Sequence, residues 1–316
     1  MHVKKLIFYY FFPVLLLISS CNGDDDKSVQ QQVSGVCSTK GKDFDANIFL
    51  QAGIHLYVIG DTGTGDSNQL TSANILDIYH QQFPLDAIIH TGDIFYPSGL
   101  KNSDDIAGMQ KFHDIYGPLS LNELPWYIVA GNHDHDGSIN ALIDFSAQHS
   151  NMFYPSPYYA ATIADTDSAL QVNIIATDTT PMTFGVVQLE QLAWLSSKLN
   201  QQSNAINIVF GHHPIFSNGS HGDTDILKGN FLQQLIHYNV PLYLSGHEHN
   251  LEYIEQSQLP NMVISGAGGR ELREVSCGKN SLYVEKKFGG FALYITQQSI
   301  WVIPVSESGV TVMFSL

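Results

Sequence analysis

Seven side chains that can bind metal ions follow short apolar runs at five separate points of the sequence. They are two carboxylates, one phenol, one amide and three imidazoles, namely Asp61, Asp93, Tyr96, Asn132, His212, His247 and His249. Each apolar run reads as a buried strand, and ligands of open α/β sheets bind beyond the carboxyl ends of the strands. We therefore expect these seven side chains to meet at one edge of a sheet.

The number and kind of these donors predict two metal ions. A single zinc-like ion takes about four ligands, whereas two neighbouring ions can share a bridging carboxylate. A phenolate such as that of Tyr96 is a hard donor that favours Fe(III), whose charge lowers the phenol pKa. The alternatives are that Tyr96 is a packing aromatic and that Asp61 and Asp93 only cap turns. The number of coinciding donors favours the metal interpretation.

The elements that must position these donors alternate along the chain. Apolar runs that predict strands cover 54–60, 86–92, 126–131, 170–177, 205–211 and 241–246. Amphipathic segments that predict helices cover 68–82, 104–116, 187–200 and 224–238. This alternation indicates an α/β domain. Beyond Gly246, six further runs predict consecutive strands that return antiparallel, so we expect one domain over residues 51–316.

Composition limits the partners of this domain. The chain has 316 residues, 44% of them hydrophobic, and a formal net charge of −16 from 14 basic and 30 acidic residues. Non-specific binding to nucleic acid needs basic stripes, so no nucleic-acid partner is expected. If the protein handles a phosphate, bound metal is the natural source of local positive charge.

The N-terminal residues predict export. Residues 1–20 carry two lysines and then a short apolar run, which is typical of a secretory signal peptide. The sequence "ISSC" resembles a bacterial lipobox, so Cys21 is expected to carry a lipid anchor and residues 21–50 to form a flexible tether. The alternative is a simple cleaved signal with a coincidental cysteine. The expected location is the bacterial cell envelope, as a lipoprotein of the periplasm or cell surface, or otherwise outside the cell.

The remaining cysteines leave a question open. In an exported protein, Cys37 and Cys277 can form one disulfide that joins the N-terminal arm to the late part of the domain. The sequence alone does not decide whether they do.

Five motifs together resemble a known family. "GDTG", "GDIFY", "GNHDHDG", "GHHP" and "GHEHN" are similar to those of the calcineurin-like metallophosphoesterases, and Tyr96 narrows the resemblance to the purple acid phosphatases. The small, tartrate-resistant type is the most similar. The resemblance implies a four-layer α/β/β/α sandwich with two mixed sheets and a site at the carboxyl ends of the strands.

The resemblance also assigns roles to the seven donors. It implies that Asp61, Tyr96, His249 and a bridging Asp93 hold Fe(III). It implies that a divalent iron, zinc or manganese ion is held, with Asp93 again, by Asn132, His212 and His247.

The implied reaction is the hydrolysis of phosphate monoesters in acid. A metal-bound hydroxide would attack phosphorus, and His133 and His221 would bind the phosphate or protonate the leaving oxygen. The expected substrate is a small phosphate monoester or a phosphoprotein, and the expected state is a monomer.

Several alternatives remain open. The same fold can serve a phosphodiesterase or nucleotidase with manganese or zinc in both positions, or a non-enzymatic lipoprotein that binds metal or phosphate. His221 can be part of a solvated loop, and His213 can either touch substrate or pack. Arg270 and Arg273 can guide an anionic substrate or be solvated surface charges.

Overall fold

The computed structural model describes residues 35–185, 188–201, 204–258, 260–278 and 280–316, whose strands form two sheets. The first sheet has eight strands in the order β1-β15-β14-β13-β2-β3-β4-β5. Its strands are β1 (Lys42–Asp43), β2 (Ile54–Ile59), β3 (Ala87–His90), β4 (Trp126–Ile128), β5 (Met152–Phe153), β13 (Gly289–Ile295), β14 (Ile300–Ser306) and β15 (Val312–Ser315). β2 to β5 run parallel and the others pair antiparallel, so the sheet is mixed.

The second sheet has seven strands in the order β12-β10-β11-β9-β8-β7-β6. They are β6 (Tyr159–Ala164), β7 (Gln171–Ala176), β8 (Ile206–Phe210), β9 (Leu242–Ser245), β10 (Leu251–Ile254), β11 (Asn261–Ser265) and β12 (Ser281–Glu285). β7, β8, β9 and β11 pair parallel, while β6, β10 and β12 pair antiparallel. This sheet is therefore mixed as well.

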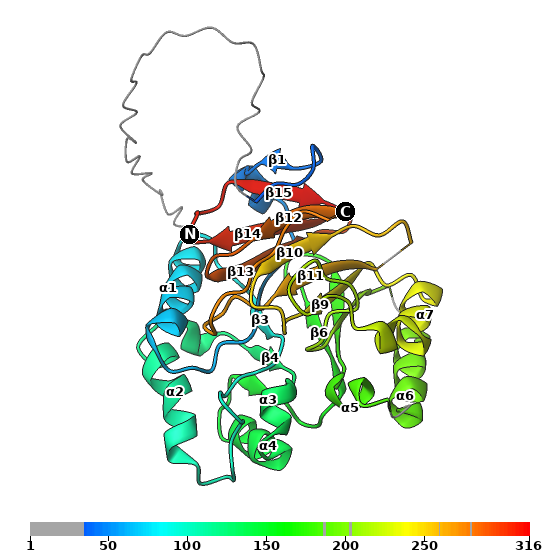
Figure 1. Cartoon of the computed structure of the whole chain (residues 1–316). Coiled ribbons are helices and arrows are strands. Elements are labelled where there is room, and N and C mark those ends of the chain that lie inside the picture. The colour runs from blue at the N-terminus through cyan, green and yellow to red at the C-terminus, as the bar shows by residue number, and fades with distance from the viewer. Residues whose placement is uncertain (1–34, 186–187, 202–203, 259, 279) are drawn as a thin grey trace, which may run out of the picture. The chain divides into compact units, whose positions relative to one another are not determined.

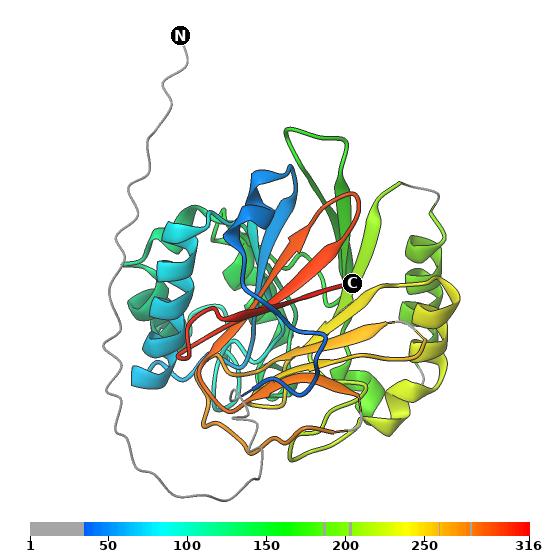
Figure 2. The same cartoon turned by 90° about the horizontal axis from the view of Figure 1, so that it is seen from above.

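Helices cover the outer face of each sheet. The described helices are α1 (Ser67–Gln82), α2 (Ile106–Tyr116), α3 (Asn132–His135), α4 (Ile139–Ala147), α5 (Thr180–Thr183), α6 (Leu189–Leu199) and α7 (Asn230–His237), with 3-10 turns η1 (Ala46–Leu50), η2 (Ser120–Glu123) and η3 (Asp225–Lys228). Figure 1 shows α1 and α2 on one outer side, α6 and α7 on the other, and the strands between them. The view from above in Figure 2 shows the same layers. The expected α/β/β/α sandwich with two mixed sheets is confirmed.

Two features of this arrangement differ from the sequence interpretation. The six late strands do not form one antiparallel block: three complete the seven-stranded sheet and three complete the eight-stranded sheet, and β11 pairs parallel with β9. The helix expected over 224–238 is divided into η3 and α7 at Gly229, whose ψ of −127° is not helical. Apolar periodicity identified these segments but carried no information about which sheet each one joins.

The folded unit begins before residue 51. Within the expected tether, β1 pairs with β15, and Val36 forms a bridge with Tyr283. Cys37 and Cys277 form a disulfide across 240 residues of sequence. Disulfides persist in oxidising compartments, so this bond is consistent with export. The expected signal peptide and the expected lipid attachment at Cys21 fall outside the described residues.

The helices in the described part of the chain are short or polar. None of its helices combines the length and the apolar character that crossing a bilayer requires.

A buried histidine under η1 makes stability depend on pH. His55 contacts the Pro84 carbonyl oxygen at 3.1 Å and the Tyr79 hydroxyl at 2.9 Å. Burial lowers the pKa of His55 to about 3, although the Pro84 bond opposes it. The unfolded chain therefore binds a proton that the folded protein does not bind, between pH 6.5 and about 3. Stability from this group is present above pH 6.5 and is lost as the pH falls.

We expect His55 alone to lower the free energy of unfolding by about 1.4 kcal/mol for each pH unit between pH 6 and pH 4. His55→Phe keeps a ring against Phe49, whose centroid lies 4.6 Å from that of His55, and removes the titration. Urea unfolding of both proteins at pH 7, 5 and 4 measures the slope. Equal slopes in the two proteins would contradict the assignment.

Candidate metal centre

The seven predicted donors all lie at the carboxyl ends of parallel strands from both sheets. Asp61 follows β2, and Asp93 and Tyr96 follow β3. Asn132 begins α3 after β4, and His212 follows β8. His247 and His249 lie between β9 and β10. Five strand ends therefore deliver the donors to one place.

Four donors form a first group around the Tyr96 hydroxyl. The hydroxyl oxygen lies 2.8 Å from Asp93 Oδ2, 3.2 Å from Asp61 Oδ1 and 3.3 Å from His249 Nε2. His249 Nε2 lies 3.5 Å from Asp61 Oδ1. The side chains of these residues are buried. Neighbouring ligands of an ion bound at about 2.0–2.2 Å are separated by roughly 3 Å, so this spacing fits one ion.

A second group of donors surrounds the Asn132 amide oxygen. That oxygen lies 3.0 Å from His212 Nε2 and 3.0 Å from His247 Nδ1. The two imidazole nitrogens lie 3.2 Å from each other, and His212 Nε2 lies 3.6 Å from Asp93 Oδ2. Asp93 Oδ2 thus contacts both groups, as a bridging carboxylate would.

The protonation of the imidazoles fits metal ligation. His212 Nδ1 lies 2.9 Å from the Thr91 carbonyl oxygen, and His249 Nδ1 lies 2.8 Å from the Glu271 carbonyl oxygen. A carbonyl only accepts, so each Nδ1 carries a proton, and the Nε2 atom of each neutral ring presents a lone pair to the cluster. Lone pairs of nitrogen and oxygen therefore converge here, and cations would satisfy them.

The backbone at the donors adopts an uncommon conformation. Asp61, Asp93 and His247 have φ values of 58°, 55° and 68°. Among the described non-glycine residues, Asn239 alone shares a positive φ with them. Such conformations cost free energy, and they gather at functional sites because the surrounding structure enforces them.

Glycines let the donor loops approach one another. Gly92 has a φ of 98°, and a Cβ there would lie 2.8 Å from His212 Nδ1. A Cβ on Gly246 would lie 2.3 Å from Asp61 Oδ2. Gly92 is therefore needed for its positive φ as well as for close approach, whereas at Gly246 the need is close approach alone.

The charges within the cluster call for a cation. Burial, together with the charges of Asp61 and Asp93, raises the pKa of the Tyr96 phenol. A phenolate at this position therefore requires a strongly charged ion beside it. Burial and the neighbouring imidazoles lower the pKa of His247, which keeps this histidine neutral, as a ligand must be.

The two histidines expected to contact substrate lie beside the donors. The His133 ring centroid lies 4.5 Å from that of Tyr96, its backbone N–H donates to Asp93 Oδ1 at 2.9 Å, and Nδ1 lies 2.6 Å from the Pro97 carbonyl oxygen. The His221 ring centroid lies 4.6 Å from that of His247. The side chain of His133 is half-buried and that of His221 is exposed.

His213 packs beside the second donor group. Thr179 Oγ1 accepts the backbone N–H groups of His212 and His213 at 3.2 and 3.0 Å, and lies 3.1 Å from His213 Nδ1. The hydroxyl proton is therefore free to donate to Nδ1, which places the ring proton on Nε2. In this tautomer His213 offers an N–H donor rather than a metal-binding lone pair.

One buried carboxylate at the site escaped the sequence interpretation. Asp134 accepts backbone N–H groups from Ile94 at 3.1 Å, Phe95 at 3.2 Å and Gly131 at 2.9 Å. It thereby joins the loop that carries Asp93 to the loop that carries Asn132. The motif "GNHD" contains Asp134, but a single Asp in a turn usually caps that turn. Its type and position therefore did not distinguish it from a turn residue.

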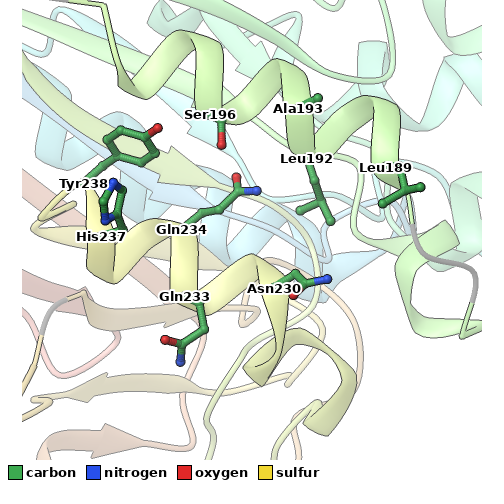
Figure 3. A pocket seen from close by; sticks show the side chains of 9 residues that line it. All are labelled: Leu189, Leu192, Ala193, Ser196, Asn230, Gln233, Gln234, His237 and Tyr238. Carbon is green, nitrogen blue, oxygen red and sulfur yellow. The ribbon is translucent and has the colours of Figure 1, made fainter.

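A hollow elsewhere on the surface does not compete with this site. It lies between α6 and α7, has a volume of about 440 Å³, and is lined by the nine residues labelled in Figure 3. None of the seven donors lines it, and its lining is a mixture of amide, hydroxyl, aromatic, imidazole and aliphatic groups.

The fold and the donor cluster at its strand ends define a metal-dependent phosphoesterase of the calcineurin-like class, and comparisons with known proteins agree. The Calcineurin-like phosphoesterase family profile matches residues 54–251. Tartrate-resistant acid phosphatase type 5 of Mus musculus is 32% identical over 72% of this chain and 77% of its own. Purple acid phosphatase 4 of Arabidopsis thaliana is 31% identical over 68% of each chain. The chain belongs to the calcineurin-like phosphoesterases and, within them, to the purple acid phosphatase family.

Solved structures show the same fold. A purple acid phosphatase from yellow lupin seeds superposes with a TM-score of 0.65 at 15% identity, covering 84% of this chain and 54% of its own. The Plasmodium protein described as "GAP50 the anchor in the inner membrane complex" superposes with a TM-score of 0.72 at 22% identity, covering 82% and 86%. At these identities the likeness concerns the fold alone.

Proposed function

We propose that this protein is an acid phosphatase that hydrolyses phosphate monoesters with an Fe(III)–M(II) centre, M being iron, zinc or manganese. The observation that carries the proposal is the Tyr96 hydroxyl, which lies 2.8 Å from Asp93 Oδ2 amid two carboxylates and an imidazole. A buried phenol among carboxylates suits a trivalent ion better than zinc or manganese alone. Family membership supports a phosphatase rather than a binding protein.

The chain's own residues would bind the ester and direct its cleavage. When bound, the two ions would neutralise the phosphoryl oxygens and activate water. His133 Nδ1 donates to the Pro97 carbonyl oxygen, so Nε2 carries a proton only when the ring is doubly protonated. His133 can therefore protonate a leaving oxygen only as the imidazolium, which favours operation in acid.

Metal analysis and a visible spectrum of wild type beside Tyr96→Phe test the iron assignment. We expect at least one iron per chain and a broad visible charge-transfer band, which the variant loses because it lacks the phenolate oxygen. Phenylalanine keeps the ring packing. A colourless and active wild type with two non-ferric ions would instead favour the phosphodiesterase or nucleotidase alternative.

Turnover of p-nitrophenyl phosphate tests the enzymatic assignment. Asn132→Ala and His212→Ala each remove a donor from the second group, and we expect them to abolish turnover. If the metal-loaded wild type binds phosphate but hydrolyses no ester, the enzymatic assignment is wrong and the non-enzymatic alternative is favoured.

We further propose that the mature protein is exported and held to a membrane by a lipid on Cys21. The proposal rests on the lipobox-like "ISSC", and the disulfide is consistent with it. Mass spectrometry of the purified N-terminal peptide distinguishes an acylated Cys21 from a simply cleaved signal.

A further inference from the structure

Two buried carboxylates beside the metal centre take no part in the donor cluster. Glu248 lies between the donors His247 and His249, and Glu252 lies in β10. Both side chains are buried. A buried carboxylate costs free energy unless hydrogen-bond donors surround it, so the partners of these two carboxylates indicate what each one does.

In the described part of the chain, the Glu252 carboxylate bonds to one loop alone. Its Oε1 accepts the Ser217 hydroxyl at 2.6 Å, and its Oε2 accepts the Asn218 backbone N–H at 2.8 Å and the Asn218 amide at 3.3 Å. The Gly219 N–H donates to Ser217 Oγ at 2.9 Å. Glu252 therefore fixes the start of this loop, which covers residues 217–222.

Glu248 holds the other end of the same loop at His221. Its Oε1 accepts the His221 backbone N–H and lies 3.2 Å from His221 Nδ1. Arg273 Nη1 lies 3.0 Å from the same Nδ1. This edge of the ring thus faces charged groups, while Nε2 has no hydrogen-bond partner among the described residues. The ring itself lies 4.6 Å from that of His247, centroid to centroid.

The sheet explains why carboxylates are needed to hold this loop. β10 is already paired on both sides, with β11 and with β12, so the loop cannot join it as a further strand. The backbone N–H groups of Asn218 and His221 find their acceptors on side chains instead, and an ionised carboxylate is a stronger acceptor than a neutral group. A Cβ on Gly219 would lie 2.7 Å from Glu248 Oε2 and 2.8 Å from Asn250 Nδ2, so the loop lies directly against these side chains.

We propose that Glu248 and Glu252 are positioning residues, which set the place of His221 relative to the metal centre and act on the reaction only through that histidine. The inference rests on the proposed function, in which His221 binds the phosphate or protonates the leaving oxygen. A reacting group that is displaced by about 1 Å can cost about 100-fold in rate. The two carboxylates can therefore control turnover without contacting substrate.

A double-mutant cycle tests whether Glu252 acts through His221. For the metal-loaded protein, kcat/KM with p-nitrophenyl phosphate is measured for wild type, Glu252→Ala, His221→Ala and the double variant. Glu252→Ala should lower kcat/KM by about 10- to 100-fold in the wild-type background. In the His221→Ala background its effect should be less than about 2-fold, because the two residues form one unit. Equal losses in the two backgrounds would overturn the proposal.

Glu285 supplies a matched control for this cycle. It is also a buried carboxylate, and it accepts the hydroxyls of Tyr283 and Ser306, each at 2.6 Å, neither of which belongs to the loop. Any effect of Glu285→Ala should therefore be the same in both backgrounds. If this effect also disappears in the His221→Ala background, the cycle reports a general loosening of the fold and the proposal fails.

Milder variants keep the proposal testable if Glu252→Ala does not fold. Ser217→Ala removes the hydroxyl that Glu252 accepts and leaves the carboxylate in place, and its effect should likewise disappear without His221. Glu248→Gln keeps an oxygen for the His221 N–H but removes the charge beside Nδ1. It should cause a smaller loss, again only where His221 is present, with the metal content per chain unchanged.

The wild type itself separates the two levels of the inference. A metal-loaded wild type that hydrolyses no p-nitrophenyl phosphate would overturn the proposed function. An active wild type in which these carboxylate variants lose the same activity with and without His221 would overturn the positioning role alone.

Discussion

Asp93→Asn is expected to remove both metal ions and to lower phosphatase activity by at least about 10⁴-fold. Asp93 Oδ2 lies 2.8 Å from the Tyr96 hydroxyl and 3.6 Å from His212 Nε2, so it belongs to both donor groups. Its other oxygen accepts the backbone N–H of His133. The asparagine oxygen can keep that bond only by turning its NH₂ group toward the cations, which removes the bridge and adds a repulsive donor.

Metal content per chain and the rate with p-nitrophenyl phosphate measure this result, and circular dichroism shows that the fold is retained. Asp66→Asn is a matched control, because Asp66 caps α1 through the N–H groups of Asn68 and Gln69 and asparagine caps a helix equally well. Two ions per chain in Asp93→Asn would show that Asp93 does not bridge.

The position of the donors could be predicted from the sequence because the fold repeats one rule. Each donor follows an apolar run, and the parallel β2, β3 and β4 end at the same edge. The same rule holds for β8 and β9 in the other sheet. Residue type and place relative to a strand end were therefore sufficient, although they could not show that two sheets contribute.

Contacts between distant residues could not be predicted in the same way. The Glu271 carbonyl that orients His249 is a backbone group, and every residue has one. Arg273 resembles any solvated charge until its 3.0 Å contact with His221 is seen. The arm at Cys37 carries no apolar pattern, so its attachment through Cys277 was left open. In each case a single contact between residues far apart in the sequence determines what the residue does. The apolar periodicity of the sequence does not reveal such a contact.

The acidity of the chain and the reaction proposed for it are compatible because charge is distributed locally. The bound ions would bring positive charge to the edge of the sheets where the donors lie, within a chain whose formal net charge is −16. Field lines focus in such a site, so a phosphate is attracted over a short range despite the net charge of −16.

Asp134→Asn is expected to weaken metal binding about 10- to 100-fold, although Asp134 is not one of the seven donors. Its two oxygens accept N–H groups from the Asp93 loop and from Gly131. Asparagine must turn its NH₂ group toward one of these sets of N–H groups, which leaves a buried donor unpaired at a cost of about 1–3 kcal/mol.

The effect should depend on pH in a direction that identifies its cause. Burial and the Asp93 charge raise the pKa of Asp134 to about 7 in the protein without ions, against the opposing N–H donors. Stability from this group is thus present at low pH and is lost as the pH rises through about 7. Bound cations favour the ionised form, so metal binding below pH 7 should release a proton from Asp134.

Proton release on metal titration at pH 6 should therefore be smaller in Asp134→Asn than in wild type. The exposed Asp136→Asn serves as the control and should match wild type. If all three proteins release the same number of protons and bind metal equally well, Asp134 is a packing residue and the two donor loops are held together by other contacts.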